Sequence, residues 1–231
     1  MVIAALLPLG NASAWDVSYE GDVMPNSPTL GSFAWSAYMA PNGLSLSSSD
    51  GEFLHLVDTD TNLPFLFRED SMLPAGTSIT METRVKVLAA SPLHDWSHAL
   101  QMGANTPYGQ VMVGFWPDRV CVRIPGETWA YYPVDLTQFH TFRIAMNATP
   151  QPEHYDLWMD GQHILTGGFW GQALYGVYFG AYGAGTAATS DSYWDYVRYS
   201  KEYLPVPEPS TLMALVGGLG ALGLPMLRRR R

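Results

Sequence analysis

Apolar and polar side chains alternate at every second position through most of the middle of the chain. From residue 77 to residue 87, Ile79, Met81 and Val85 fall on one face of an extended chain, and Glu82 and Lys86 fall on the other. The same period recurs over residues 111–115, 120–124, 142–146, 155–159, 175–182 and 193–199. A period of two is the pattern of half-buried β-strands. The sequence therefore predicts an all-β chain with antiparallel sheets.

Turn residues separate the alternating segments. Pro117-Asp118 stands between two of them and predicts a short hairpin, and Asp160-Gly161 closes another. The 22 glycines and 17 prolines are spread along the chain, which fits many short strands joined by tight turns. Residues 15–203 show no sustained helical period and no internal repeat. We expect one domain over 15–203, an antiparallel two-sheet β-sandwich.

Composition and charge limit the kinds of molecule that the protein can bind. The chain is 47% hydrophobic and 14% charged, which is enough apolar material for one sizeable core. Of its 21 acidic and 12 basic residues, Glu208 and the four terminal arginines belong to the C-terminal end, which leaves 20 acidic and 8 basic residues elsewhere. Such an acidic body repels phosphate backbones, so we expect no nucleic-acid partner. The single cysteine, Cys121, is predicted to be a small strand residue.

The first 14 residues have the pattern of a secretory signal. An apolar run over residues 2–9 is followed by the small-residue triplet Ala12-Ser13-Ala14. We predict a signal peptide over 1–14, with cleavage after Ala14 and Trp15 as the mature N-terminus. A positively charged region before the apolar run is missing, and a buried first strand is the alternative interpretation.

The C-terminal end combines three features. The triplet Pro207-Glu208-Pro209 precedes an apolar run over residues 212–227, and the chain ends in Arg228, Arg229, Arg230 and Arg231. As a helix the run would reach about 24 Å, less than the roughly 30 Å of a bilayer's hydrocarbon core. Arginines resist transfer into the bilayer, so they stay on the cytoplasmic side and leave the body on the other side of the inner membrane.

This order of triplet, short apolar helix and arginine cluster resembles the PEP-CTERM sorting signal, here over residues 204–231. The resemblance implies recognition and processing by an exosortase-type membrane enzyme. It also implies a Gram-negative bacterium that makes extracellular polysaccharide, in which the protein is transiently anchored in the membrane and then found at the cell surface or outside the cell. An ordinary tail anchor is the alternative.

The body resembles the concanavalin A-like lectin/glucanase jelly roll, including laminin-G-type modules. The similarity rests on three stretches, residues 109–124, 139–165 and 193–200. It implies two curved antiparallel sheets, with a ligand on the concave face. The glucanases of this fold place catalytic acids at E-x-D-x-E or E-x-D-x-x-E spacing on one strand. No such triplet occurs in this sequence. We therefore expect no catalytic residues and a protein that is not an enzyme.

Metal ligands are sparse in the sequence. His94 and His98 stand four apart, but their flanks predict a loop instead of a helix, which disfavours a zinc site. In the glucanases an aspartate of the closing strand binds a structural calcium together with an early backbone carbonyl. By that resemblance Asp195 and Gly51 are the candidates for a structural calcium, and a hydrogen-bonded strand aspartate is the alternative for Asp195. The sequence contains no other cofactor signature.

Strand alternation also predicts a binding face. Trp116, Arg119 and Arg123 project away from the face that holds the valines of their strands, and Trp129 and Tyr131 share one side of the next strand. Aromatic rings beside arginines suit an acidic sugar polymer, because rings stack on sugar faces and guanidinium groups bind carboxylates. The leading hypothesis is a non-catalytic exported protein that binds extracellular polysaccharide. A glycan-active enzyme with an unrecognised site and a purely structural matrix or biofilm component are the rivals.

Overall fold

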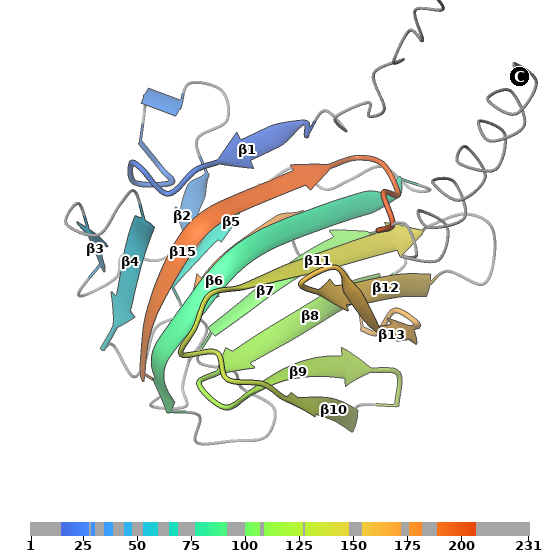
Figure 1. The fold of residues 1–231 in the computed structure, drawn as a ribbon. Coiled ribbons are helices and arrows are strands. Elements are labelled where there is room, and N and C mark those ends of the chain that lie inside the picture. The colour runs from blue at the N-terminus through green and yellow to red at the C-terminus, as the bar shows by residue number, and fades with distance from the viewer. Residues whose placement is uncertain are drawn as a thin grey trace, which may run out of the picture.

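The computed structural model describes residues 15–27, 29–30, 35–38, 44–47, 53–59, 65–68, 77–91, 100–106, 109–126, 128–147, 154–171, 176–181 and 189–206. These residues form two antiparallel sheets packed face to face, as the alternation predicts (Figure 1). The predicted fold class, an all-β two-sheet sandwich, is confirmed.

Sheet A has eight strands. In spatial order they are β13 (Gln162–Gly167), β12 (His154–Met159), β11 (His140–Asn147), β6 (Ile79–Ser91), β15 (Thr189–Ser200), β4 (Phe53–Asp58) and β3 (Leu44–Ser47), and β1 (Val17–Tyr19) pairs with β15. The long strands β6 and β15 bow as arcs, and the other sheet lies on the inner side of the bow (Figure 1).

Sheet B has seven strands. In spatial order they are β10 (Thr128–Pro133), β9 (Arg119–Ile124), β8 (Gly109–Trp116), β7 (Leu100–Thr106), β14 (Val177–Ala181), β5 (Phe65–Arg68) and β2 (Ser36–Tyr38). Consecutive strands β7 to β10 pair as a meander, and the predicted hairpin at Pro117-Asp118 joins β8 to β9 with Trp116 opposite Arg119.

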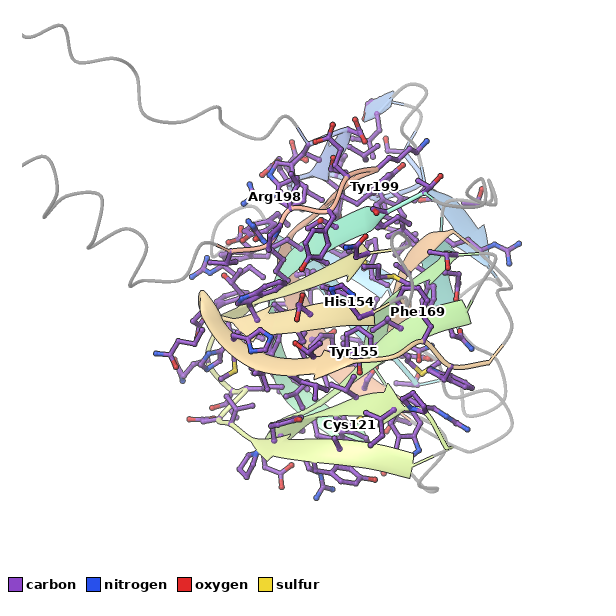
Figure 2. The ribbon with its side chains drawn as sticks, turned by 90° about the vertical axis from the view of Figure 1, so that its right-hand side faces the viewer. Cys121, His154, Tyr155, Phe169, Arg198 and Tyr199 are labelled. Carbon is purple, nitrogen blue, oxygen red and sulfur yellow. The ribbon has the colours of Figure 1, made fainter. Side chains whose placement is uncertain are left out.

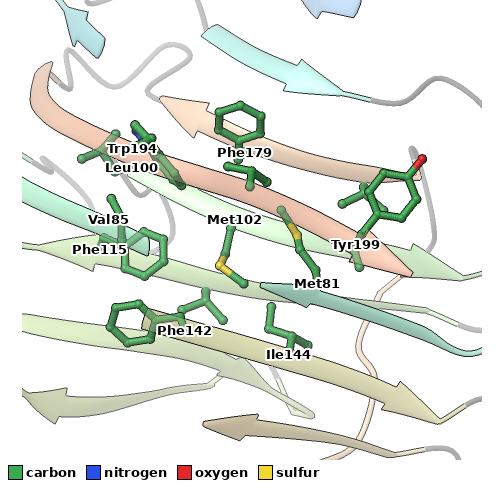
Figure 3. Close-up of a cluster of buried hydrophobic side chains, with 14 of the residues drawn as sticks. Met81, Val85, Leu100, Met102, Phe115, Phe142, Ile144, Phe179, Trp194 and Tyr199 are labelled. Carbon is green, nitrogen blue, oxygen red and sulfur yellow. The ribbon is translucent and has the colours of Figure 1, made fainter. Parts of the chain in front are cut away.

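The hydrophobic core fills the space between the sheets (Figure 3). Alternating positions of β6 supply Ile79, Met81 and Val85, all fully buried. At the centre the Trp194 ring of sheet A meets Phe179 of sheet B, with ring centroids 5.1 Å apart. Aromatic side chains bury the most area per residue, so this contact contributes strongly to holding the two sheets together.

The predicted turn at Asp160-Gly161 is confirmed. Both residues have positive φ, 51° for Asp160 and 77° for Gly161. Two consecutive positive φ values define the type I′ turn, whose twist matches that of the strands it joins. The turn brings β12 and β13 together as a hairpin at the edge of sheet A.

Several predictions fall outside the described residues. These are the signal segment with Ala14, the histidines His94 and His98, Gly51, the sorting residues Pro207, Glu208 and Pro209, the apolar run 212–227 and Arg228 to Arg231. Among the residues that the structure does describe, no helix has the length and hydrophobicity needed to cross a bilayer.

Candidate functional site

The outer face of sheet B collects the aromatic and arginine side chains that the sequence singled out. Val113, Val120 and Val122 point into the core and are fully buried. The alternate positions of β8 and β9 therefore point outward. The pairing of Trp116 with Arg119 across these strands brings an indole beside a guanidinium.

The first of two arginine–aromatic groups is the Arg119 stack, made of Trp116, Arg119 and Tyr131. The Arg119 guanidinium carbon lies 5.3 Å from the centroid of the Trp116 ring and 5.7 Å from that of Tyr131. Tyr131 is 47% exposed, whereas Trp116 is only 5% exposed. Trp116 therefore supports Arg119 from within the sheet, and Arg119 and Tyr131 are the members that solvent reaches.

The second group is the Arg123 stack, made of Trp129, Arg123 and Trp170. The Arg123 guanidinium carbon lies 3.9 Å from the Trp170 ring centroid and 5.1 Å from that of Trp129. Trp170 belongs to no strand. It is placed by backbone hydrogen bonds with Gln110, 2.9 Å and 3.2 Å long. Sequence reasoning missed Trp170 because a single bridge outside a strand leaves no alternation to detect.

The strands of sheet B contain three arginines and no aspartate or glutamate. Among the described residues, the carboxylate that pairs with Arg119 is that of the exposed Asp118, at 3.7 Å. On sheet A, Arg84 pairs with Asp195 and Arg143 with Glu82. Over the described ranges, the strands of sheet B therefore carry arginine side chains without a carboxylate in the same strands.

Buried amides lie on the same face in β7. Gln101 and Asn105 are each 1% exposed. Within the described part of the chain, Oε1 of Gln101 and both polar atoms of the Asn105 amide have no hydrogen-bond partner. Between them the Tyr178 ring lies across Gly103, where a Cβ atom would come within 2.3 Å of it. These amides and the Tyr178 ring are therefore buried and form the support beneath this face.

Cys121 lies on β9 and is fully buried (Figure 2). Burial is the main cause that raises the pKa of its thiol above the usual range. The thiolate is the reactive form of cysteine, so the structure gives Cys121 no nucleophilic character. This agrees with its prediction as a small strand residue.

A shallow hollow of about 630 Å³ opens at the end of sheet B near the β8–β9 turn. It is lined by Pro117, Asp118, Pro133, Val134, Asp135 and Thr137. Asp135 accepts hydrogen bonds from the Thr137 hydroxyl and from its backbone N–H, and these hold the pKa of the Asp135 carboxyl below its ordinary value. Two of its lining residues adjoin Arg119, since Asp118 precedes it in the chain and Pro133 is its partner across β9 and β10.

The two residues predicted for calcium are not brought together by the described part of the structure. Asp195 occupies a bulge of β15 and forms an ion pair with Arg84. Gly51 lies outside the described residues. No group of three or more histidine, cysteine, aspartate or glutamate side chains among the described residues has the arrangement of a metal site. Calcium binding at Asp195 stays a prediction.

Comparison with known families identifies the C-terminal end. Residues 205–231 match the PEP-CTERM protein-sorting motif. The chain carries a sorting signal. The matched residues include the predicted triplet, apolar run and arginine cluster. The motif marks the protein for export, with transient membrane anchoring and processing by an exosortase-type enzyme, as the sequence resemblance implies.

Comparison with solved structures confirms the fold of the body. An endo-1,3-β-glucanase from Streptomyces sioyaensis superposes with a TM-score of 0.51 at 13% identity, covering 84% of this chain and 98% of the glucanase. A β-1,3-1,4-glucanase (lichenase) derived from a mouse hindgut metagenome gives 0.50 at 15% identity, covering 80% and 99%. These similarities show the concanavalin A-like jelly roll and, at such low identity, the fold alone.

The same fold occurs in a protein that is not a glucanase. The binding domain of botulinum neurotoxin DC, solved in complex with SialylT, superposes with a TM-score of 0.50 at 8% identity, covering 83% of this chain and 47% of that one. The chain therefore spans about half the length of the neurotoxin domains that it matches. No curated protein has a sequence significantly similar to this chain.

Proposed function

We propose that the protein is a non-catalytic surface or matrix protein that binds an acidic extracellular polysaccharide on the outer face of sheet B. The observation that supports this most is the pair of neighbouring arginines, Arg119 and Arg123, each stacked on two aromatic rings in a sheet whose strands contain no carboxylate. Stacking on aromatic rings fixes the plane of a guanidinium and so limits the directions in which its N–H donors can point.

The chemistry of the face favours a sugar polymer with carboxylate groups. A guanidinium binds a carboxylate through two parallel hydrogen bonds, which makes it selective for uronate-type residues over neutral sugars. Tyr131 offers an exposed ring for the apolar face of a pyranose.

The glucanase-like fold raises the alternative of a glycan-active enzyme. Glycoside hydrolysis needs two carboxyl groups flanking the scissile bond, about 5 to 9 Å apart. The strands of sheet B supply none. The second alternative is a structural matrix component without a sugar ligand.

Equilibrium binding of the purified full-length protein to polygalacturonate and to a neutral β-glucan tests the proposal. We expect the acidic polymer to bind and the neutral one to bind at least about ten-fold more weakly, a difference of about 1.4 kcal/mol. Arg119→Ala should weaken binding of the acidic polymer by a similar factor. Arg123→Lys keeps the charge but loses the planar stack, and should weaken binding as well.

Arg84→Ala is the matched control. It removes the same charge from sheet A, where Arg84 is paired with Asp195, and should leave binding unchanged. Equal weakening by Arg84→Ala and Arg119→Ala would show a non-specific charge effect and reject the site. Release of reducing sugar ends from either polymer would favour the enzyme, and no binding of either by the wild type would favour the structural role.

A further inference from the structure

The residues that directly precede the sorting motif are bound to the outer face of sheet A. Residues 201–204, here called the clasp, follow the end of β15. The hydroxyl of Thr80 donates to the carbonyl of Glu202 at 2.7 Å and accepts from the N–H of Leu204 at 2.8 Å. Thr80 is fully buried. One buried hydroxyl on β6 therefore satisfies two backbone groups of the clasp.

Two further side chains of sheet A hold the same residues. The Tyr203 hydroxyl donates to Oδ2 of Asp156 at 2.5 Å, and Arg143 donates to the carbonyl of Leu204 at 3.3 Å. Asp156 is itself 8% exposed and is further bonded by Thr166 and His163. The clasp is thus attached to a fixed group on β12 as well as to β6 and β11.

The N-terminal end of the described chain contributes the remaining contact. The carboxylate of Asp16 accepts the N–H of Lys201 at 2.6 Å. Every residue of the clasp therefore has at least one hydrogen bond to a side chain of the folded domain, from Asp16, Thr80, Arg143 or Asp156. Such a segment opens separately from the rest of the fold only at a measurable cost in free energy.

The clasp ends three residues before the sorting triplet. Fully extended, three residues span at most about 10 Å. An enzyme that grips Pro207-Glu208-Pro209 and the residues just before it needs this stretch in an accessible, extended form. In the clasp, however, both backbone polar groups of Leu204 are already bonded to Thr80 and Arg143.

We propose that the clasp delays processing of the sorting motif, because the exosortase-type enzyme can engage the triplet only after the clasp has detached from sheet A. Folding of the sandwich and release of the tail are thereby coupled. A chain whose sheet A is complete keeps its tail for longer than one whose clasp is loosened.

Two substitutions loosen the clasp at different points. Tyr203→Phe removes the hydroxyl that donates to Asp156 and keeps the ring, and Thr80→Val removes both hydrogen bonds of the hydroxyl while keeping the shape of the side chain. Losing one net hydrogen bond corresponds to a factor of about five in an opening equilibrium. We expect the amide of Leu204 to exchange with solvent at least about five-fold faster in Thr80→Val.

Processing is measured on the full-length chain in cells that contain an exosortase-type enzyme, by pulse-chase conversion of the precursor to the shortened form. Tyr203→Phe and Thr80→Val should both shorten the half-time, by about three- to five-fold. Tyr196→Phe is the matched control, since the Tyr196 hydroxyl donates to Glu82 on the same face, whereas the side-chain hydrogen bonds of the described clasp come from Asp16, Thr80, Arg143 and Asp156. Its half-time should equal that of the wild type.

A half-time in Thr80→Val that is unchanged or longer, while the Leu204 amide exchanges faster, overturns the proposal, because detachment then does not limit processing. An equal gain in Tyr196→Phe and Tyr203→Phe also overturns it, since the effect would come from general destabilisation. Faster processing confined to the two clasp variants supports it.

Discussion

Glu82 is the residue that organises the polar side chains on the outer face of sheet A. Its carboxylate accepts from Nε of Arg143 at 2.6 Å, from Arg198 at 2.5 Å and from the hydroxyl of Tyr196 at 3.0 Å. Trp15 covers both arginines, with its ring centroid 4.6 Å from the guanidinium carbon of Arg198. The alternation of β6 placed Glu82 on the outward face, and these neighbours bury it to 4% exposure.

Neutralising Glu82 should therefore be costly. Glu82→Gln removes the negative charge that Arg143 and Arg198 share in a partly buried site, and we expect the free energy of unfolding to fall by about 3 kcal/mol. Urea denaturation at neutral pH measures this. Asp118→Asn is the control, because its pairing with Arg119 is exposed and should contribute almost nothing. A loss below about 1 kcal/mol in Glu82→Gln would contradict the assigned role.

At the scale of single elements, a substitution in the β12–β13 turn tests the backbone conformation alone, because it does not change side-chain packing. A Cβ atom added to Gly161 would meet no atom within 4 Å, so only its φ of 77° opposes a side chain. Gly161→Ala should lower the free energy of unfolding by about 1 kcal/mol, because left-handed backbone is unfavourable for alanine. Asparagine tolerates this conformation, so Gly161→Asn should lose clearly less in the same denaturation experiment. Equal losses would contradict the turn assignment.

Elements with clear alternation could be predicted from the sequence, and elements without it could not. The outward and inward faces of β6, β8 and β9 follow directly from their apolar period. The start of β15 was missed, because Ser190, Asp191 and Ser192 carry no apolar signal. Their backbone nonetheless pairs with β4 and β6 on both sides. Pairing partners supply hydrogen bonds that sequence periodicity does not encode.

The candidate site, too, could be predicted from the sequence only in part. Trp116, Arg119, Arg123, Trp129 and Tyr131 could be assigned to one face, because strand alternation fixes which way a side chain points. Alternation does not show how deeply a side chain is buried. It therefore did not show that Trp116 is nearly buried, nor that Trp170 and the amides of β7 join the same face.

At the scale of the whole molecule, acid stability depends on Asp156. Burial by itself would raise the pKa of its carboxyl, but hydrogen bonds from Thr166, Tyr203 and His163, with the nearby His154, outweigh burial and leave the pKa below its ordinary value of 3.8. His154 lies at the start of β12, the strand that also carries Asp156 (Figure 2). A carboxyl with a lowered folded-state pKa stabilises the fold above its unfolded pKa, and this stabilisation is lost as the pH falls through the folded value.

Stability should therefore fall as the pH drops below about 4, through this carboxyl among others. Asp156→Asn cannot titrate, so its free energy of unfolding should be lower than that of the wild type at pH 7 and should converge on it near pH 2. Denaturant titrations across this range measure both curves. A constant difference between them at all pH values would contradict the lowered pKa.

Acidic and basic residues are also unevenly distributed over the whole molecule. The full chain has a formal net charge of −9, yet the strands of sheet B hold three arginines and no acid. An acidic protein that binds an acidic polymer must do so through a local positive face, and this separation provides one.

The hydrogen bond between Asp16 and Lys201 places both ends of the described chain at one spot on sheet A. The residues that lead into the sorting motif therefore leave the domain at sheet A, and the Arg119 and Arg123 stacks lie on the other sheet. If the outer face of sheet B binds polymer, as proposed, ligand binding and processing of the tail take place on opposite sides of the sandwich.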